Sequence, residues 1–287
     1  METLPLTLLV MTYNEAGNIG RCLDSVPLAA EKIVIDSGST DDTCAVAARH
    51  GGRVVHQDWL GFGPQRNFAS TVAAHDWILF LDADECLSPE LLSAFAARLP
   101  ALMKSDAAGA ILRREAWYLG APMRWYKPMV GEKIARLYHR GRARWTDARV
   151  HESLRFDGRV EHFNAPFRHY YNPTLVHEQL KMLKYSELKA RDWLERGRSP
   201  RLWAAPLVFL STFFKDYILR RGFLDGARGY IVSHVAANYA VYKRLRYYEM
   251  RRNPESLGLA EAVLKKHRLQ RGQGATSDPQ EATSDER

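Results

Sequence analysis

The chain of 287 residues has few cysteines and no long uninterrupted apolar run. Its three cysteines are scattered and odd in number, which argues against a disulfide framework and indicates a reducing compartment. The longest apolar run, LWAAPLVFLSTFF at residues 202–214, contains a proline and is too short to span a bilayer. The beginning, METLPLTLLV, lacks a basic segment ahead of its apolar residues and predicts a strand rather than a signal peptide. We therefore expect a cytoplasmic protein.

The sequence also lacks the glycine-rich loops that hold phosphates in two large classes of nucleotide-binding proteins. It has no G-x-x-x-x-G-K-[ST] loop, and no G-x-G-x-x-G follows the first predicted strand. The segment HESLR at residues 151–155 differs from H-E-x-x-H, which excludes a zinc peptidase of that type. Any bound phosphate must then be held mainly by a metal ion and by cationic side chains.

Positive charge is concentrated near the C-terminus. The net charge is +8, yet residues 200–271 alone contain 14 Lys and Arg against 5 Asp and Glu, an excess of nine. Hydrophobic content of 46% and charged content of 26% are ordinary for a globular protein. The length suits one large domain, or one domain with an appendage.

The first hundred residues alternate short apolar segments with helical patterns, which is typical of βαβ units. Strands are predicted at residues 6–12, 32–37, 53–58 and 77–84, and helices at residues 16–26 and 40–50. We therefore expect an α/β fold with a mostly parallel sheet that helices cover on both faces.

The rest of the chain is less regular. Further strands are predicted at residues 109–119 and 134–140, where they would extend the sheet. The pattern becomes helical from about Asn172. Residues 272–287 lack large apolar side chains and are predicted to be disordered.

Polar residues follow three of the predicted strands where each strand ends. They are TYNE at residues 12–15, DSGSTDDT at residues 36–43 and DADE at residues 82–85. Ligands of such sheets bind beyond the carboxyl ends of the strands, so we expect the three segments to converge on one crevice.

The D-x-D pair, Asp82 and Asp84, places two carboxylates on the same side of an extended chain. Clustered oxygen ligands suit Mg²⁺ or Mn²⁺, which usually complete their shell with phosphate oxygens. The alternative is a solvated acidic turn that caps the helix beginning near Pro89.

Four segments, quoted in chain order, carry a resemblance to a known family. They are VMTYNEAGNIGRCLDSV, IVIDSGSTDDT, PQRNFA and DWILFLDADE, all within residues 6–90. Together they resemble the donor-binding half of the family 2 glycosyltransferases. The resemblance implies the GT-A fold, a mixed and mostly parallel sheet with helices on both faces, and a nucleotide-diphosphate sugar as donor.

The resemblance also implies roles for individual residues. It places residues 12–15 around the nucleobase and ribose, and Asp36 at the uracil edge. Asp82 would approach the ribose or the metal, Asp84 would be the ligand of Mg²⁺ or Mn²⁺, and Arg66 would meet the diphosphate. The implied donor-side residues are thus Thr12, Tyr13, Asn14, Glu15, Asp36, Arg66, Asp82 and Asp84.

Two of these residues have structural alternatives. Asp36 could be a helix N-cap or part of an Asx turn, but Ser39 and Thr40 are better placed to cap the next helix, so we favour the nucleotide role. Arg66 could instead be a surface arginine on a helix.

Inverting transfer needs a base on the acceptor side of the anomeric carbon, opposite the D-x-D pair. The segment ARVHESL at residues 148–154 contains a VHE motif and follows a predicted strand with the motif RLY at residues 136–138. This order of motifs resembles a subgroup of family 2 enzymes. The resemblance implies that Glu152 is the catalytic base, that His151 positions it or approaches the metal, and that Arg136 binds substrate. Asp147 is the substitute candidate, and a structural His-Glu pair bonded to an arginine is the alternative.

The second half of the chain includes HYYNPTLVHEQLKMLKYSELKARDWLERG at residues 169–197 and KDYILRRGFLDGARGYIVSHVAANYAVYKRLRYYE at residues 215–249. With these segments, the sequence over its whole length resembles bacterial lipopolysaccharide core glycosyltransferases of the inner-core heptose β-1,4-glucosyltransferase type. The resemblance implies transfer of glucose from UDP-glucose to a heptose of an anionic lipid. We expect a catalytic domain at residues 1–170, divided near residue 100 into donor and acceptor halves. A basic helical extension follows at residues 171–271.

An anionic lipid acceptor requires cations near the site and contact with the inner face of the cytoplasmic membrane. The candidate acceptor contacts are Arg113, Arg114, Arg124, Lys127, Trp117, Tyr118, Trp125 and Tyr126, although such aromatics are also common in cores. The candidate membrane-contact residues are Ile231, Val235, Tyr239, Tyr242, Lys243, Arg244, Arg246, Arg251 and Arg252. The alternative for this segment is a helix that packs on the catalytic domain and has a solvated basic end. The first interpretation predicts a peripheral membrane protein.

Two other kinds of function are compatible with parts of the sequence. Within the enzyme class, the acceptor could be a polyprenyl phosphate or another lipid- or protein-linked glycan. A basic module that binds nucleic acid is the alternative outside that class, but it leaves three acidic strand ends unexplained. We therefore expect no nucleic-acid partner.

Overall fold

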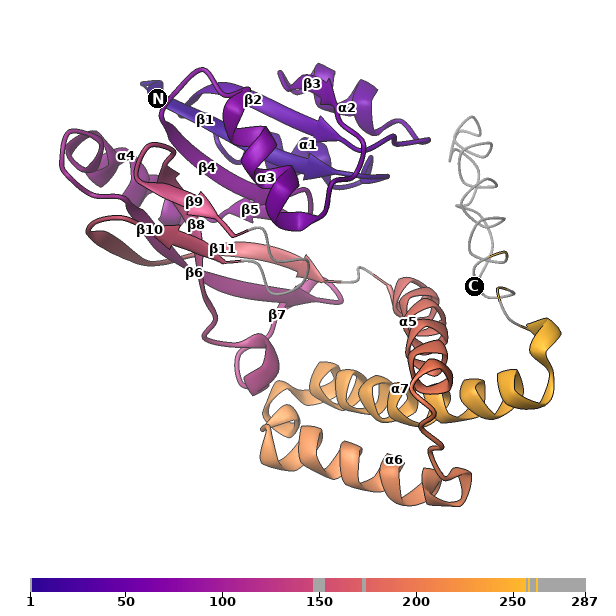
Figure 1. Cartoon of the computed structure of the whole chain (residues 1–287). Helices are drawn as coiled ribbons and strands as arrows, with labels where there is room; N and C mark the ends of the chain where they lie inside the picture. Colours follow the sequence, from indigo (N-terminus) through magenta and orange to yellow (C-terminus); the bar gives the residue numbers. More distant parts are fainter. Residues whose placement is uncertain (1, 147–152, 172–173, 257, 259–261, 263–287) are drawn as a thin grey trace, which may run out of the picture.

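The computed structural model describes residues 2–146, 153–171, 174–256, 258 and 262. The described chain forms two parts: a mixed β-sheet flanked by helices, and a set of helices that follows it in sequence (Figure 1). The predicted α/β fold with a C-terminal helical region is confirmed.

The larger sheet is mixed and mostly parallel. Its strands are β1 (Leu4–Thr12), β2 (Ala29–Asp36), β3 (Arg53–His56), β4 (Trp77–Asp82), β5 (Glu85–Leu87), β6 (Gly109–Tyr118), β7 (Ala121–Pro122), β8 (Lys133–His139) and β11 (Val160–Tyr171). The order is β3-β2-β1-β4-β8-β6-β11-β5, and β7 pairs with β6. Strands β1, β2, β3, β4, β6 and β11 run in one direction, whereas β5, β7 and β8 run in the other.

Helices cover both faces of this sheet because its central strands are apolar on both sides. In β1, Leu6, Leu8 and Val10 join the core under α1 (Ile19–Asp24), α2 (Thr43–Arg49) and α4 (Pro89–Met103). Leu9 points to the opposite face, where α3 (Phe62–Thr71) and the hairpin of β9 (Ala143–Trp145) and β10 (Leu154–Phe156) pack. Successive side chains of a strand face opposite ways, so an unbroken apolar run buries both faces.

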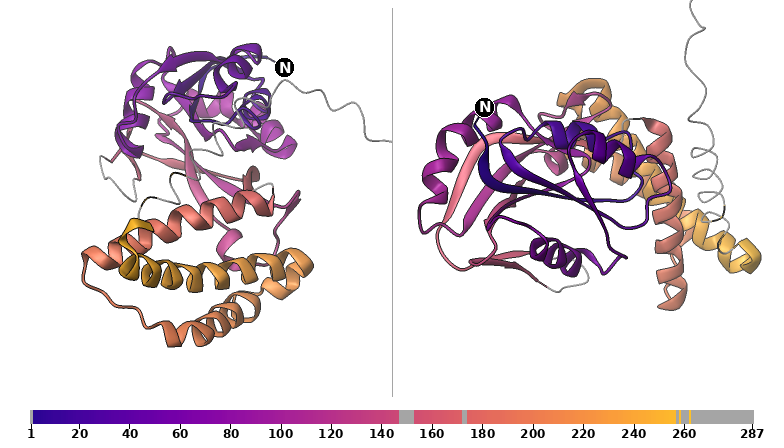
Figure 2. Two further views of the ribbon diagram at one scale, coloured as in Figure 1. Left: turned by 90° about the vertical axis from the view of Figure 1, so that its right-hand side faces the viewer. Right: turned by 90° about the horizontal axis from the view of Figure 1, so that it is seen from above.

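The helical part contains α5 (Leu175–Glu195), α6 (Ala205–Phe214) and α7 (Gly226–Arg252). Helix α7 lies between α6 and the sheet part and packs against both α5 and α6 (Figures 1 and 2). Arg246 of α7 is buried and donates hydrogen bonds to the Glu187 carboxylate and the Ser256 carbonyl. Arg246 is therefore a structural residue, and its predicted place in a membrane-contact cluster is wrong.

Two sets of polar contacts hold the helical part against the sheet. The Tyr118 hydroxyl donates a 2.5 Å hydrogen bond to Glu178 of α5. The Asp225 carboxylate accepts the three backbone N–H groups of residues 124–126, at 2.7 to 3.0 Å. Burial raises the pKa of Tyr126 to about 12. Tyr118 and Tyr126 are thus core residues of this interface, whereas the Trp125 side chain is 50% exposed.

The apolar run at residues 202–214 belongs to a longer helical segment. A 3-10 turn (Leu202–Ala204), α6 and a π-helical turn (Lys215–Leu219) follow one another without a break. By length and composition this segment, Leu202–Leu219, is able to cross a membrane, although one such helix is weak evidence. The predicted limit on length therefore applies to the run alone and not to the helix that contains it.

Candidate active site

The loops that follow β1 and β2 are tied together by hydrogen bonds. The backbone N–H of Asn14 donates to Ser39 Oγ, and the N–H of Thr40 donates to Asn14 Oδ1, both at 2.8 Å. The N–H of Glu15 donates to Thr43 Oγ1 at 2.8 Å. Asn14 has a φ of 57°, a left-handed conformation that asparagine tolerates better than most residues. These contacts give the loop after β1 one defined shape.

The third polar strand end adjoins these two. The Thr12 carbonyl accepts the N–H of Ser37, which joins the ends of β1 and β2. Met11 of β1 pairs with Asp82 of β4, so the end of β4 lies beside the end of β1. The predicted convergence of the three segments is therefore observed. The Tyr13 side chain, at the end of β1, is 46% exposed.

Asp36 is buried, and its carboxylate orders its own turn. Oδ2 accepts the N–H groups of Gly38 and Ser39 at 3.0 and 2.9 Å, and Oδ1 accepts the Ser39 hydroxyl at 2.5 Å. The Asx-turn alternative thus describes the observed hydrogen bonds of Asp36. A nucleotide role would be additional to it.

The expectation that Ser39 and Thr40 cap the next helix is wrong. Helix α2 begins at Thr43, and the N–H of Thr43 donates to Asp41 Oδ1 at 3.0 Å. Ser39 and Thr40 instead bind the Asn14 loop, as described above. The pattern of short polar residues was compatible with either use, because all of them bond readily to nearby backbone groups.

The acidic motif joins two strands. Strand β4 ends at Asp82, a turn contains Asp84, and β5 begins at Glu85. The following helix α4 is capped by Ser88, whose hydroxyl accepts the N–H of Leu91. The alternative in which the acidic residues cap this helix is therefore wrong.

Arg136 of β8 neutralises two members of the motif. Its guanidinium donates to Asp82 at 2.8 Å and to Glu85 at 2.6 Å. Burial alone would raise the pKa of Asp82, but Arg136 and then Arg66 reverse this effect and hold that pKa below its ordinary value. Burial raises the pKa of Glu85, and the charge of Asp82 adds to this effect while Arg136 opposes it. Arg136 and Glu85 thus form a buried ion pair, and Asp82, whose side chain is 37% exposed, extends this cluster toward the surface.

Arg66 of α3 faces the same cluster. Its guanidinium lies 3.9 Å from Asp82 and over the rings of Phe80 and Trp145, at 4.7 and 4.4 Å from their centroids. The residue is only 6% exposed. The alternative of a surface arginine is wrong, and Arg66 contributes a buried positive charge beside the D-x-D pair.

His169 was missed by the sequence analysis. It lies in β11 opposite Glu85, and its Nε2 is 3.2 Å from Asp84 Oδ2. Its ring contacts that of Tyr171 at 4.1 Å. No motif marked it, because β11 reaches the acidic motif only through pairing between strands distant in sequence. The nearest sequence signal is the polar and aromatic composition of the segment RHYY.

The two aspartates of the motif differ in their surroundings. Asp82 pairs with Arg136, whereas Asp84 contacts His169, and both side chains are partly exposed, at 37% and 28%. Burial raises the pKa of Glu15, and the nearby charge of Asp84 contributes to that rise. Asp84 and Glu15 therefore share one electrostatic environment, and within the described residues Asp84 is the aspartate of the pair that no arginine neutralises.

A divalent cation fits these residues. Carboxylate oxygens suit Mg²⁺ and Mn²⁺, and imidazole nitrogen also suits the latter. His169 Nδ1 is buried and has no hydrogen-bond partner within the described residues. The described part of the chain contains no group of three or more His, Cys, Asp or Glu suited to a metal. The protein would therefore supply Asp84 and His169, and phosphate or water oxygens would complete the shell.

The predicted base Glu152, its neighbour His151 and the substitute Asp147 lie outside the described residues. The described residues on either side meet each other: the N–H of Thr146 donates to the carbonyl of Ser153 at 3.0 Å. Asn67 of α3 bonds the backbone of Trp145 through both side-chain groups. The chain thus enters and leaves this segment at one place, next to the helix that carries Arg66.

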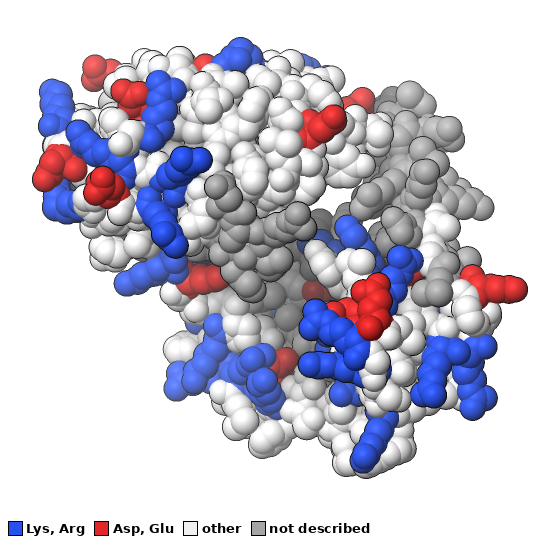
Figure 3. All heavy atoms as spheres, viewed as in Figure 1, with Lys and Arg blue, Asp and Glu red and all other residues white. Residues whose placement is uncertain are grey.

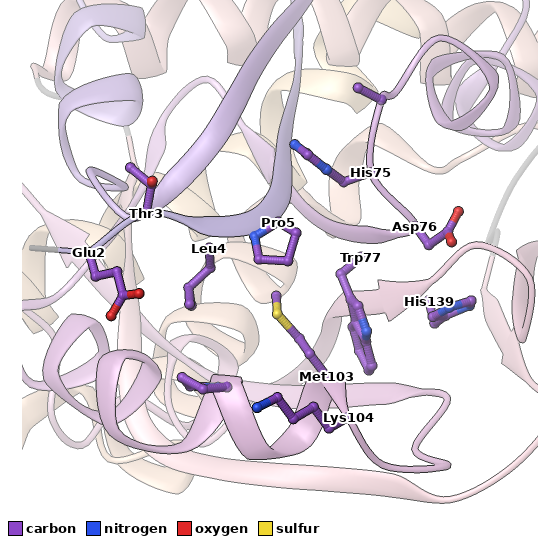
Figure 4. Close-up of a pocket in the computed structure, with 12 residues that line it drawn as sticks. Glu2, Thr3, Leu4, Pro5, His75, Asp76, Trp77, Met103, Lys104 and His139 are labelled. Atoms are coloured by element: carbon purple, nitrogen blue, oxygen red, sulfur yellow. The ribbon is translucent and has the colours of Figure 1, made fainter.

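A cavity of about 580 Å³ lies at the opposite end of the strands (Figure 4). It is lined by the start of β1, by Trp77 at the start of β4 and by Met103 at the end of α4. None of the predicted site residues lines it. It is therefore separate from the carboxyl ends where the polar loops converge.

Comparison with known proteins identifies relatives of the chain. Residues 7–152 match the model of the glycosyl transferase family 2. A lipopolysaccharide core biosynthesis glycosyltransferase, LpsC of Rhizobium meliloti, is 29% identical over 86% of this chain and 93% of its own length. An uncharacterized glycosyltransferase of Rickettsia bellii is 31% identical over 88% of this chain and 90% of its own.

Similar solved structures cover less of the molecule. One is glucosyl-3-phosphoglycerate synthase from Mycobacterium tuberculosis in complex with Mn²⁺, uridine diphosphate and glucosyl-3-phosphoglycerate. It is 25% identical, with a TM-score of 0.32, over 41% of this chain and 44% of its own.

Proposed function

Because the chain belongs to glycosyl transferase family 2, we propose that it is an inverting, metal-dependent hexosyltransferase of lipopolysaccharide inner-core synthesis. The proposed donor is UDP-glucose and the proposed acceptor is a heptose of the core. One observation carries the proposal: arginines neutralise Asp82, while Asp84 remains within reach of a cation beside His169. Arginines on one aspartate and a cation-binding carboxylate on the other suit a site that receives a diphosphate.

On the donor side, the loops after β1 and β2 would receive the nucleoside. The exposed ring of Tyr13 offers a flat face for a base, and Asp36 would accept the N–H of uracil. Arg66 would lie near the diphosphate. A divalent ion on Asp84 and His169, when bound, would neutralise charge on the departing diphosphate.

On the acceptor side, Glu152 would accept the proton of the attacking hydroxyl. As the new glycosidic bond forms at the anomeric carbon, the bond to UDP breaks and UDP leaves with the electron pair. Attack from the face opposite the diphosphate inverts the anomeric centre. His151 would position Glu152.

The lipopolysaccharide assignment rests on LpsC of Rhizobium meliloti, whose printed name specifies core biosynthesis and which aligns over 86% of this chain. We propose residues 1–170 as the catalytic domain and residues 171–271 as an extension that keeps the enzyme at the cytoplasmic face of the inner membrane.

A donor and acceptor screen tests the proposed function. Several UDP-sugars are each incubated with the full chain, a divalent cation and a truncated inner-core lipid, and the products are read by mass. A mass gain of one hexose from UDP-glucose on the heptose-containing lipid is expected. Transfer only to a polyprenyl phosphate, or only from another donor, would overturn the corresponding assignment.

Asp36→Ala is expected to weaken UDP binding by at least about tenfold, since a hydrogen bond to a charged group contributes about 1.5–3 kcal/mol. Asp41→Ala is the comparison, because the Asp41 carboxylate likewise accepts backbone N–H groups, that of Thr43 in its own turn and that of Ala16 in the loop after β1. Titration calorimetry and thermal unfolding are measured for both variants. Equal UDP affinity of the two variants, at similar loss of stability, would remove Asp36 from the site.

His169→Gln is expected to lower the affinity for Mn²⁺ by at least about 10- to 100-fold, the loss that removal of a mere partner of a metal ligand commonly causes. The reason is that His169 Nε2 contacts the Asp84 carboxylate. The affinity is measured by electron paramagnetic resonance with UDP present. His162→Gln, also in β11, is the control. An unchanged Mn²⁺ affinity in His169→Gln would leave His169 with a packing role only.

A further inference from the structure

Helix α6 exposes a stripe of large apolar side chains. Trp203, Leu207, Leu210, Phe214 and Ile218 recur every three or four residues and therefore share one face of the helical segment. These side chains are between 42% and 68% exposed, and only 6% of the segment Leu202–Leu219 is buried. A contiguous exposed apolar surface of this kind marks an interaction site in a soluble protein.

The opposite face of α6 is already occupied by α7. Phe209 lies against His234 at 5.5 Å and Phe213 against Tyr230 at 5.6 Å, measured between ring centroids. Helix α6 is also the helix farthest from the sheet part (Figures 1 and 2). Helix α6 therefore has two apolar faces within the described structure. One packs on α7, and the other, the stripe, is exposed.

The charges around the stripe are positive. No charged residue lies at residues 202–214, whereas Arg201 precedes the run, and Lys215 and Arg221 follow it, all three exposed. The single acidic residue of the segment, Asp216, is buried and paired with Arg220. Figure 3 shows Lys and Arg side chains over the helical part on the face viewed, with fewer Asp and Glu among them.

We propose that this surface, the exposed α6 face with its flanking cations, lies flat on an anionic phospholipid membrane. An apolar stripe flanked by arginine and lysine is the pattern of a helix that enters the headgroup region from the side. Trp203 sits at one end of the stripe, as aromatic side chains do at membrane interfaces. The contact surface is thus α6, rather than the α7 residues that the sequence suggested.

Lying on the membrane fits the fold better than crossing it. At about 1.5 Å per residue, an 18-residue segment reaches only about 27 Å, slightly less than the hydrocarbon core of a bilayer. Crossing would also separate Phe209 and Phe213 from α7 and carry the Asp216–Arg220 pair into lipid. A shallow orientation keeps every one of these contacts.

The turns that follow the C-terminal end of α6 are joined by hydrogen bonds to the acceptor half of the catalytic part. The N–H of Lys127 donates to the carbonyl of Arg220 at 3.0 Å, and Asp225 holds the backbone of residues 124–126. The exposed Arg124 and Trp125 therefore lie beside the membrane-contact surface. A lipid-linked sugar would then meet these side chains close to the membrane, and this last step rests on the proposed function.

The test compares two triple variants of the full chain. Leu207→Ser, Leu210→Ser and Phe214→Ser together remove the apolar stripe from α6. Leu175→Ser, Val176→Ser and Leu188→Ser together are the matched control, since these α5 side chains are 43% to 57% exposed. Circular dichroism and thermal unfolding establish that both variants fold.

Sedimentation with phosphatidylglycerol-containing vesicles is measured without donor or acceptor, with phosphatidylcholine vesicles for comparison. The wild type and the α5 variant are expected to bind the anionic vesicles and to be released by high salt. The α6 variant should lose at least about tenfold in partitioning. Failure of this inference would leave transfer to a soluble truncated acceptor intact, whereas failure of the proposed function would abolish transfer and leave vesicle binding.

Three outcomes would overturn the proposal. Equal vesicle binding by the α6 variant and the wild type would remove the stripe from the contact. Wild-type protein that resists salt and alkaline carbonate, and that only detergent extracts, would show a spanning helix. A dimer in light scattering that the α6 variant breaks, without vesicle binding by the wild type, would identify a second copy of the chain as the partner.

Discussion

Asp84→Ala is expected to abolish transfer and metal-dependent UDP binding while the fold remains intact. Metal stabilisation of a leaving phosphate contributes several kcal/mol, so the loss should reach at least about 10³ in rate. The fold should survive because the Asp84 side chain is 28% exposed and sits in a turn. Its backbone carbonyl, which accepts the N–H of Tyr170, is unchanged by the substitution.

The measurements are product formation, UDP affinity with and without Mn²⁺, and thermal unfolding. Asp76→Ala is the matched control, since Asp76 directly precedes the same strand β4 and forms its own ion pair with Arg140 at 2.9 Å. This variant should retain both transfer and UDP binding. Wild-type transfer that persists in excess EDTA would contradict the metal role of Asp84.

Asp82 would be a poor choice for the same test. Its carboxylate is one of the two partners of the buried Arg136, and Arg66 lies nearby. Removing Asp82 takes away one of the two carboxylates that pair with the buried Arg136 and leaves Glu85 to neutralise it alone. A loss of activity in Asp82→Ala would therefore mix destabilisation with any loss of substrate contact. Asp84 has no arginine partner within the described residues, so a loss of activity in Asp84→Ala is easier to interpret.

The sheet and the meeting of the polar strand ends were predictable because they depend on local patterns. The run WILFL at residues 77–81 of β4 is apolar at every position, which indicates a strand buried on both faces. In such sheets the carboxyl ends of the parallel strands adjoin, so polar residues at the ends of β1, β2 and β4 were expected to meet. The hydrogen bonds of Asn14 and Thr12 join the first two segments, and the pairing of Met11 with Asp82 places the end of β4 beside them.

The missed features depend on contacts between distant segments. His169 reaches Asp84 because β11 pairs with β5, and no local pattern specifies that pairing. Arg246 belongs to a basic run, yet it is buried because Glu187 and the Ser256 carbonyl accept its N–H groups. The exposed stripe on α6 could not be predicted for a similar reason. Helix α6 is apolar on both faces, and the sequence does not tell which face packs on α7.

Glu152→Gln tests the chemical step itself. The role of Glu152 comes from the order of the RLY and VHE segments, and the residue lies outside the described part of the chain. The described neighbours support the proposal, because the hairpin next to it packs on α3 and places Trp145 over Arg66. The described ends of this segment therefore lie near Arg66, the proposed partner of the donor diphosphate.

The glutamine retains the size and hydrogen bonding of the side chain but cannot accept the proton of the acceptor hydroxyl. Turnover should therefore fall by at least about 10², whereas UDP affinity should change little, because the lost interaction belongs to the transition state. Asp147→Asn is the control and should be much milder. Turnover is measured at saturating donor and acceptor, and UDP affinity by calorimetry. Near-normal turnover in Glu152→Gln, or a reversed order of the two variants, would place the base elsewhere, since a proton acceptor cannot be removed without slowing the step that needs it.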